Sequence, residues 1–120
     1  PFQDNSFDNV FCSFVWRNVS DTNIALNEVY RVLRPGGRFI LLDMTRPKNS
    51  FLRMLHKIGT FKVLHLIGLI TFNLKEYRFL YKSLDFYPQP EEHLNKDNFI
   101  DLRIERMGVF NFVYLAVFTK

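Results

Sequence analysis

The sequence predicts a single α/β domain, and three observations carry that prediction. A strand, a helix and a second strand follow one another within residues 8–43, the order of a βαβ unit in a parallel sheet. Residues 50–86 show a helical pattern in two pieces. Residues 99–119 first alternate in polarity and then continue as a second β-rich run, which indicates an antiparallel hairpin.

The first predicted strand spans Asp8 to Phe14. Its sequence is rich in strand-forming side chains but lacks a clear alternation of polar and apolar residues. A parallel strand that is covered on both faces has this pattern. We therefore expect a buried strand in the centre of its sheet.

The next element is a helix, because apolar side chains recur with the spacing of one buried helical face, at Leu26, Val29, Tyr30 and Leu33. Ser20 or Asp21 is the expected N-cap. The segment Pro35-Gly36-Gly37 is expected to end the helix, since proline cannot continue it and glycine accepts the positive φ of a C-terminal cap. A second buried strand then follows over residues 38–43.

The second half of the chain combines helices with a hairpin. Helical segments are expected from Ser50 to about Phe86, with a break around residues 72–74. Apolar and charged side chains then alternate as in a strand with two unequal faces, at Ile100, Leu102 and Ile104 and at Asp101, Arg103 and Glu105. A turn at residues 107–109 and a β-rich run over residues 110–119 complete the expected hairpin.

Composition excludes several classes of protein. At 48% hydrophobic and 23% charged residues, the chain can bury a core and is not disordered. Its single cysteine, Cys12, supports neither an internal disulfide nor a multi-thiolate metal site, which favours an intracellular, reducing compartment. The three histidines lack metal-ligand spacing, so we expect no metal. The net charge of +4 comes without a basic cluster, which argues against a nucleic-acid partner.

Aromatic residues make up 17% of the chain, and 14 of them are phenylalanine. Since phenylalanine has no polar group, most of these rings are expected to fill the core. The longest apolar stretch, Phe51 to Phe72, is interrupted by basic and imidazole side chains and is too polar to span a membrane. The chain opens with a polar, acidic segment that shows no leader and looks like mid-domain sequence.

Several motifs together resemble a known family: Pro1–Asp8, Cys12–Phe14, Arg17–Val19 and Tyr30–Arg38, followed by Thr60–Leu64 and Glu76–Leu80. With them the chain resembles the C-terminal half of a class I S-adenosylmethionine (SAM) dependent methyltransferase. Within that superfamily it is most similar to the UbiE-type C-methyltransferases of menaquinone and ubiquinone biosynthesis. The likeness fades after Leu94, and Val15-Trp16 departs from the Gly-Leu of the family.

The resemblance implies that residues 1–120 are a partial methyltransferase domain, the C-terminal half of a class I Rossmann-like sheet from its fourth strand onward. It implies two parallel strands with helices, a helical insertion or lid over about residues 48–87, and a terminal antiparallel hairpin. The Gly-rich cofactor loop belongs to the other half of such a domain, and no G-x-G motif occurs in this sequence.

Ligands of open α/β sheets bind beyond the carboxyl ends of the strands, which places the expected site at residues 13–21 and 43–46. The resemblance implies that Ser13 and Phe14 contact SAM, with the Ser13 hydroxyl bonding its amino-acid end. Plainer interpretations stay open: Ser13 bonds its own loop, and Phe14 is part of the core or of a pocket wall.

The resemblance also implies that Arg17 and Asn18 lie near the transferring methyl group. Methylation of a ring carbon needs an electron-rich phenolate, which a cation and an amide donor would stabilise. Arginine stays protonated, so Arg17 is expected to stabilise the phenolate or to orient a water base, while Asn18 holds the ring oxygen. The alternative is structural, with Arg17 paired to Asp21 and Asn18 capping the helix.

Tyr77 and Arg78 match the segment that caps the substrate pocket in the resembling family, so substrate binding is expected of both. The alternative is a buried helix face, because side chains share helical spacing at Tyr77, Leu80, Tyr81 and Leu84.

The resemblance implies SAM as the cofactor and a prenylated quinol as the methyl acceptor. The alternatives are a non-catalytic fragment or degenerate paralogue, and a class I methyltransferase with another small-molecule acceptor. Residues 51–72 have the composition of a helix that rests on an anionic membrane, or of a lid with a solvated basic edge. The expected location is intracellular, either cytoplasmic or peripheral on a membrane, which in a eukaryote would be the matrix side of the mitochondrial inner membrane. A central strand without its neighbour is expected to self-associate, so a homo-oligomer is also expected.

Overall fold

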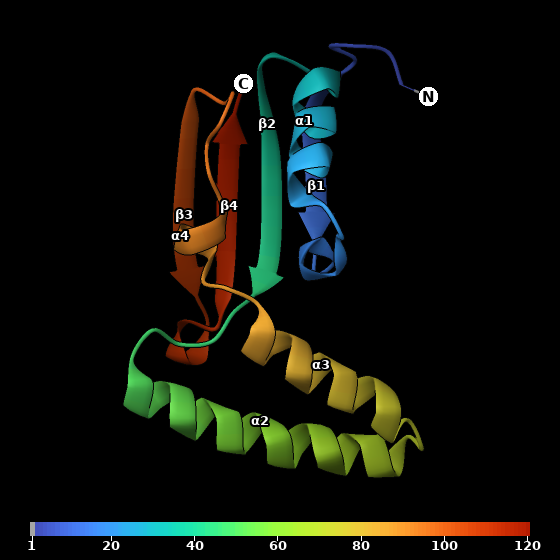
Figure 1. Cartoon of the computed structure of the whole chain (residues 1–120), viewed down its shortest axis with the longest axis vertical. Coiled ribbons are helices and arrows are strands. Elements are labelled where there is room, and N and C mark those ends of the chain that lie inside the picture. The colour runs from blue at the N-terminus through green and yellow to red at the C-terminus, as the bar shows by residue number, and fades with distance from the viewer. Residues whose placement is uncertain (1) are drawn as a thin grey trace.

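The computed structural model of the protein describes residues 2–120, and it contains one four-stranded sheet with helices (Figure 1). The strands are β1 (Phe7–Ser13), β2 (Leu33–Met44), β3 (Asp101–Met107) and β4 (Val113–Thr119). The helices are α1 (Thr22–Val32), α2 (Ser50–Ile70), α3 (Leu74–Phe86) and α4 (Pro90–His93), with two 3-10 turns, η1 (Trp16–Asn18) and η2 (Val109–Asn111). The predicted α/β class is confirmed, and Pro1 of the first motif lies outside the described residues.

The strand order is β1-β2-β4-β3. β1 pairs with β2 in parallel, and α1 connects them, so the predicted βαβ unit is confirmed. β4 pairs antiparallel with both β2 and β3, which confirms the predicted terminal hairpin. This arrangement brings the chain's last strand between its second and third.

α1 ends earlier than the sequence predicts. Its last residue is Val32, and the C-cap Leu33 is extended, with φ −71° and ψ 140°. The pairing with β1 jumps from Leu33 to Arg38, so residues 34–37 bulge out of β2 and do not cap the helix. Gly36 has its positive φ of 80° inside this bulge. The extended Leu33 places a fully buried side chain in the core, which a longer helix would not allow.

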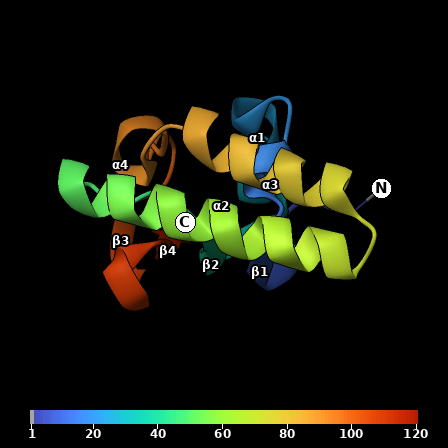
Figure 2. The same cartoon turned by 90° about the horizontal axis from the view of Figure 1, so that it is seen from below.

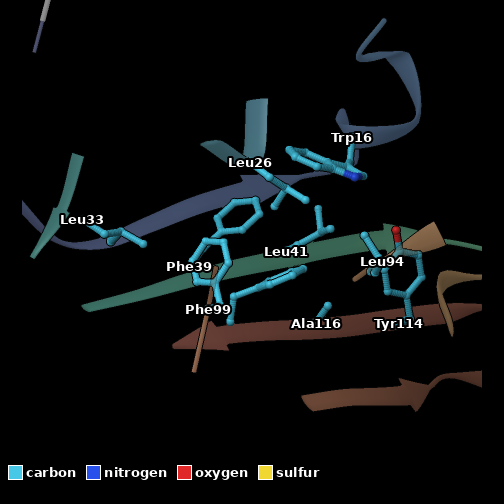
Figure 3. Packing of buried hydrophobic residues seen from close by; sticks show 10 residues of the cluster. Trp16, Leu26, Leu33, Phe39, Leu41, Leu94, Phe99, Tyr114 and Ala116 are labelled. Carbon is cyan, nitrogen blue, oxygen red and sulfur yellow. The ribbon is translucent and has the colours of Figure 1, made fainter. Parts of the chain in front are cut away.

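The core lies on one face of the sheet, because α1 and α4 are on the same side of the strands (Figure 2). Its central residues come from the sheet, α1, η1 and the segment after α4: Trp16, Leu26, Leu33, Phe39, Leu41, Leu94, Phe99, Tyr114, Ala116 and Phe118 (Figure 3). Phe39 and Phe118 are cross-strand partners whose ring centroids are 5.5 Å apart. Trp16 packs on Phe39 at 5.4 Å, so the loop after β1 is anchored in the core.

The other face of β1 is open, and the prediction of a strand covered on both faces is wrong for this chain. Val10 and Cys12 pack against the core, whereas Phe11 between them is 71% exposed. The physical reason is that α1 covers only one side of the strand. β1 is also an edge strand, because β2 is its only neighbour among residues 2–120.

α2 and α3 form a helical pair at the carboxyl ends of β1 and β2 (Figure 1). The prediction of two helical pieces is confirmed, with the break at residues 71–73. Asn49 caps α2 by accepting hydrogen bonds from the backbone N–H groups of Phe51 and Leu52. The helices approach closely at Gly68, where a Cβ atom would lie 3.1 Å from the Leu74 Cα.

Exposed phenylalanines are the largest departure from the sequence prediction. Of the 14 phenylalanines, nine are exposed. Several of them lie on the helical pair, including Phe51 and Phe79, whereas the buried rings Phe39, Phe99 and Phe118 belong to the sheet region. The expectation that most rings fill the core is therefore wrong. Among the described helices, none has the length and apolar character needed to cross a bilayer.

Candidate functional site

The candidate site lies where the parallel strands β1 and β2 end side by side. Both strands point toward the helical pair (Figure 1). Ser13 ends β1, and Asp43 stands one residue before the end of β2. The Phe14 backbone N–H donates to the Leu42 carbonyl at 2.8 Å, so the loop after β1 begins beside β2. This is the edge at which open α/β sheets bind ligands.

Arg17 and Asp43 form a buried ion pair across this edge. Arg17 Nη1 lies 2.5 Å from Asp43 Oδ1, and the side chains are 7% and 1% exposed. The Arg17 backbone N–H also donates to Asp43 Oδ2 at 3.2 Å. The alternative of an Arg17–Asp21 pair is wrong, because Asp21 caps α1 instead.

Asn18 ends the η1 turn and is exposed. Its backbone N–H donates to the Val15 carbonyl at 2.9 Å. The alternative in which Asn18 caps α1 is wrong, since Asp21 accepts from the N–H groups of Asn23 and Ile24 at 3.0 Å. The Asn18 amide makes no hydrogen bond to residues 2–120 and is open to a ligand.

Ser13 and Phe14 stand at the mouth of the same edge, and both are exposed. The Ser13 hydroxyl makes no hydrogen bond within the described part of the chain, so the interpretation in which it bonds its own loop is not observed. Phe14 has a φ of 56° and is 42% exposed. That left-handed turn directs the chain out of the sheet, and Phe14 is not part of the core.

Neutral polar groups lie within electrostatic reach of the ion pair. The Tyr87 and Tyr114 hydroxyls are buried without a hydrogen-bond partner in residues 2–120. Burial, and then the charge of Asp43, raise the pKa of Tyr87 to about 12. The same two causes raise the pKa of Tyr114 and of the Cys12 thiol. All three groups therefore stay uncharged at neutral pH beside Arg17 and Asp43.

Tyr77 and Arg78 lie on α3 and are not joined to the ion pair by any hydrogen bond or salt bridge within residues 2–120. Tyr77 is half-buried and Arg78 is exposed. Both line a small pocket between α2 and α3, with Phe61, Leu64, His65, Leu74 and Tyr81. Its volume of about 20 Å³ accommodates at most a water molecule, so this pocket does not hold an aromatic ring.

Arg46 fastens the helical pair to the end of β2. Its side chain is 3% exposed, and Nε lies 3.0 Å from Asp85 Oδ1 on α3. Nη1 lies 3.3 Å from His56 Nδ1 and 3.2 Å from Thr60 Oγ1 on α2. Burial and the Arg46 charge lower the pKa of His56, which keeps its ring neutral and able to accept this hydrogen bond. Both helices are thus tied to the candidate site through one buried cation.

Sequence reasoning placed Asp43 and Trp16 within the expected site but assigned neither of them a role, and it missed Tyr87. Asp43 was within the expected range, but no sequence signal paired it with Arg17. Trp16 appeared only as a departure from a motif, and Tyr87 belongs to no pattern. The one available signal was the rule that parallel strands end at the same edge, which makes residues after β1 and at the end of β2 neighbours.

Comparison with known proteins places the chain among methyltransferases. A sequence model of the ubiE/COQ5 methyltransferase family matches residues 1–107. A ubiquinone/menaquinone biosynthesis C-methyltransferase UbiE from Rickettsia bellii is 45% identical over 93 residues, which cover 77% of this chain and 38% of the relative. The protein of the same name from Pasteurella multocida is 37% identical over 112 residues, covering 92% of this chain and 41% of the relative. The chain thus spans about two fifths of the length of these relatives.

The fold has a counterpart among solved structures. A crystal structure described as a possible exported protein from Bordetella parapertussis superposes with a TM-score of 0.58 at 16% identity, covering 99% of this chain and 40% of that one. This likeness concerns the fold alone, whereas the sequence match is what decides the family. The chain belongs to the ubiE/COQ5 methyltransferase family.

Proposed function

We propose that the protein that carries this chain transfers a methyl group from SAM to a ring carbon of a prenylated quinol. The observation that carries the proposal is the Arg17–Asp43 pair at the carboxyl edge of the sheet, in a member of this family. The names of the relatives, C-methyltransferases of ubiquinone and menaquinone biosynthesis, support the reaction and the substrate class. Residues 1–120 then form a partial methyltransferase domain, with α2 and α3 as its lid.

Arg17 and Asn18 are the proposed catalytic residues. The guanidinium of Arg17 stabilises the phenolate form of the acceptor, whose negative charge makes the ring carbon nucleophilic. The exposed Asn18 amide donates a hydrogen bond to the same ring oxygen. Arg17 stays protonated, so it holds the phenolate or a water base and does not itself remove the proton.

Ser13 and Phe14 are the proposed SAM contacts, and their geometry fits one side of such a site. The Ser13 hydroxyl has no partner in the described chain, and the Phe14 ring is exposed at the strand end. SAM supplies the electrophilic methyl group when bound. Since the sequence holds no G-x-G loop, the chain by itself is expected to bind SAM weakly in calorimetry.

Tyr77 and Arg78 are proposed to contact the acceptor from the lid. The pocket that they line between α2 and α3 is too small for a ring. The acceptor would therefore contact the solvent-facing sides of Tyr77 and Arg78. Arg78 is exposed and takes part in no ion pair within residues 2–120, which supports a role in binding.

Substitution of Arg17 in the full-length protein tests the proposal. Arg17→Ala should lower turnover by roughly 10²-fold or more, the range for loss of an oxyanion donor, while SAM affinity changes little. Arg17→Lys should not restore full activity, because an ammonium lacks the planar fork of the guanidinium. Asn18→Ala belongs to the same class, whereas Ser13→Ala should mainly weaken SAM binding.

Intact turnover in Arg17→Ala, with only a lower melting temperature, would withdraw the catalytic role of Arg17. The alternatives are distinguished separately. A coding sequence upstream of Pro1 that encodes a Gly-rich loop supports the enzyme, and an in-frame stop there supports a non-catalytic fragment or degenerate paralogue. Turnover with a different aromatic acceptor, and none with a prenylated quinol, would change only the substrate class.

We also propose that the helical pair rests on an anionic membrane surface, where a prenylated quinol would be dissolved. Large apolar side chains, between 46% and 66% exposed, follow one outward stripe of α2: Phe51, Met54, Leu55, Ile58, Leu66 and Leu69. α2 contains no acidic residue. The two helices carry an excess of four positive charges, which equals the net charge of the whole chain. An apolar stripe with this charge complements anionic lipid headgroups.

Vesicle binding tests this contact in the full-length protein. It should co-sediment more strongly with phosphatidylcholine vesicles that contain phosphatidylglycerol than with phosphatidylcholine alone, and salt should weaken binding. Lys75→Glu with Lys82→Glu should reduce binding at least about tenfold, given about 1 kcal/mol for each basic residue at the surface. Lys96→Glu, an exposed lysine outside the pair, is the matched control. Equal binding to both vesicles would remove the electrostatic part of the proposal.

Self-association is proposed for the 120-residue chain itself. The open edge of β1 presents unpaired backbone groups beside the exposed Phe11 ring, a surface that pairs readily with another strand. Sedimentation should show dimers or larger species. A cooperatively folded monomer would contradict the proposal.

A further inference from the structure

We propose that Asp43 is the positioning residue of Arg17, and this inference rests on the proposed methyl transfer. Asp43 holds the guanidinium at the place where the acceptor's oxygen is stabilised. It does so from β2, 26 residues further along the chain, and does not itself touch the acceptor.

The Asp43 carboxylate holds Arg17 through several hydrogen bonds. Both of its oxygens are used: Oδ1 accepts from Arg17 Nη1 at 2.5 Å and from the Met44 backbone N–H at 2.7 Å, while Oδ2 accepts from the Arg17 backbone N–H at 3.2 Å. One group therefore fixes both the main chain and the side chain of Arg17. It also joins the η1 turn to the end of β2, the two segments between which a ligand would bind.

The Arg17 guanidinium keeps N–H donors that Asp43 does not use. The Arg17 side chain makes no hydrogen bond within residues 2–120 other than the one to Asp43. None of its nitrogens is a buried atom without a partner, so its other N–H groups reach solvent. A purely structural buried arginine uses most of its donors, as Arg46 does with Asp85, His56 and Thr60. The Arg17 side chain is therefore fixed through one nitrogen, Nη1, and its other N–H groups can donate to a ligand.

Arg17 and Asp43 depend on each other for charge neutralisation. Asp43 is fully buried, and the titratable groups of neighbouring elements within its electrostatic reach are Arg17, Cys12, Tyr87, His93 and Tyr114. Of these only Arg17 is charged at neutral pH. Among the described ion pairs, Arg17 is the only cation that pairs with Asp43, and Asp43 is the only anion that pairs with Arg17. Removal of the carboxylate charge therefore releases the guanidinium from its fixed place.

The test uses the full-length protein and Asp43→Asn, which keeps the shape of the side chain and removes its charge. A displaced Arg17 should lower kcat by roughly 10²-fold, the effect of misplacing a catalytic group by about 1 Å. The KM for SAM should stay unchanged. Asp43→Glu, which keeps the charge, should recover part of the lost kcat. Glu91→Gln, which removes the charge from the Glu91–Arg106 pair elsewhere, is the matched control and should leave kcat unchanged.

Coupling between the two residues supplies the decisive readout. If Asp43 acts through Arg17, the double variant Arg17→Ala with Asp43→Asn should be no slower than Arg17→Ala alone. Multiplicative losses in the double variant would overturn the positioning role. If Asp43→Asn does not fold, Asp43→Glu decides: its loss of kcat should vanish in the Arg17→Ala background, and an equal loss in both backgrounds overturns the inference.

The outcomes also separate this inference from the proposed function. Wild-type turnover in Arg17→Ala refutes the catalytic role of Arg17, and the positioning role of Asp43 is refuted with it. Slow turnover in Arg17→Ala combined with normal turnover in a folded Asp43→Asn refutes the positioning role alone.

Discussion

The sheet region and the helical pair use the same residue types in opposite ways. In the sheet, Phe39 and Phe118 are 1% and 0% exposed and pack on each other, and Trp16 packs on Phe39. On the helical pair, Phe51 and Phe79 are 66% and 61% exposed. The only buried residues of α2 and α3 are Gly68 and Leu84.

The difference teaches that burial of a ring depends on a second layer and not on the ring itself. The sheet offers a flat face that α1 and the segment after α4 cover, so alternate side chains of β4 are fully buried. The outward stripe of α2 has no such cover among the described residues. A stripe of exposed apolar side chains is a common interaction surface, so the proposed membrane contact is placed there.

The largest expected effect is a loss of stability in the core of the sheet region. Phe39→Ala should lower the free energy of unfolding by about 3–5 kcal/mol, because it leaves a cavity between Trp16 and Phe118. Phe51→Ala, the matched change on the helical pair, should change it by less than about 0.5 kcal/mol. Urea denaturation of the two variants measures both. A loss in Phe51→Ala as large as in Phe39→Ala would mean that the α2 stripe is covered in solution.

A smaller effect tests the contact between α2 and α3. Gly68→Ala should destabilise the protein by roughly 1–3 kcal/mol, since a Cβ would lie 3.1 Å from the Leu74 Cα and 3.4 Å from the Tyr77 ring. Gly59→Ala is the control on the same helix, where a Cβ meets nothing within 4 Å. It should stabilise α2 by up to about 1 kcal/mol through helix propensity. Thermal melting should therefore shift in opposite directions, and equal shifts would contradict the close approach at Gly68.

The smallest expected effect is the pH dependence that His93 gives to the sheet region. His93 is half-buried, its Nδ1 lies 2.8 Å from the Gln89 carbonyl, and burial lowers its pKa from 6.5. As pH falls below about 6.5, the unfolded chain takes up a proton that the folded protein does not yet bind, so stability declines. His93→Phe should reduce this decline, measured as urea midpoints from pH 7 to pH 5. An undiminished decline in His93→Phe would refute the role of burial.

Local patterns predicted the elements because helix and strand periodicity are properties of short segments. The helical pair, the terminal hairpin and α1 up to its final turn all follow from the spacing of apolar side chains. The end of α1 did not, because Leu33 leaves the helix in order to place its side chain in the core. Coverage of β1 also escaped prediction, since an apolar strand has the same sequence whether one face or both are packed.

The sequence by itself determined the α/β class, the order of the elements, the family motifs and the edge of the sheet where the candidate site lies. Only the tertiary structure decided which residue holds Arg17. Asp21, four residues away, was the nearest acid in sequence, but its carboxylate satisfies the free N–H groups at the start of α1. Asp43 is distant in sequence, and it reaches Arg17 because parallel strands bring their carboxyl ends to one edge. A pairing across that edge depends on strand register, which no local pattern encodes.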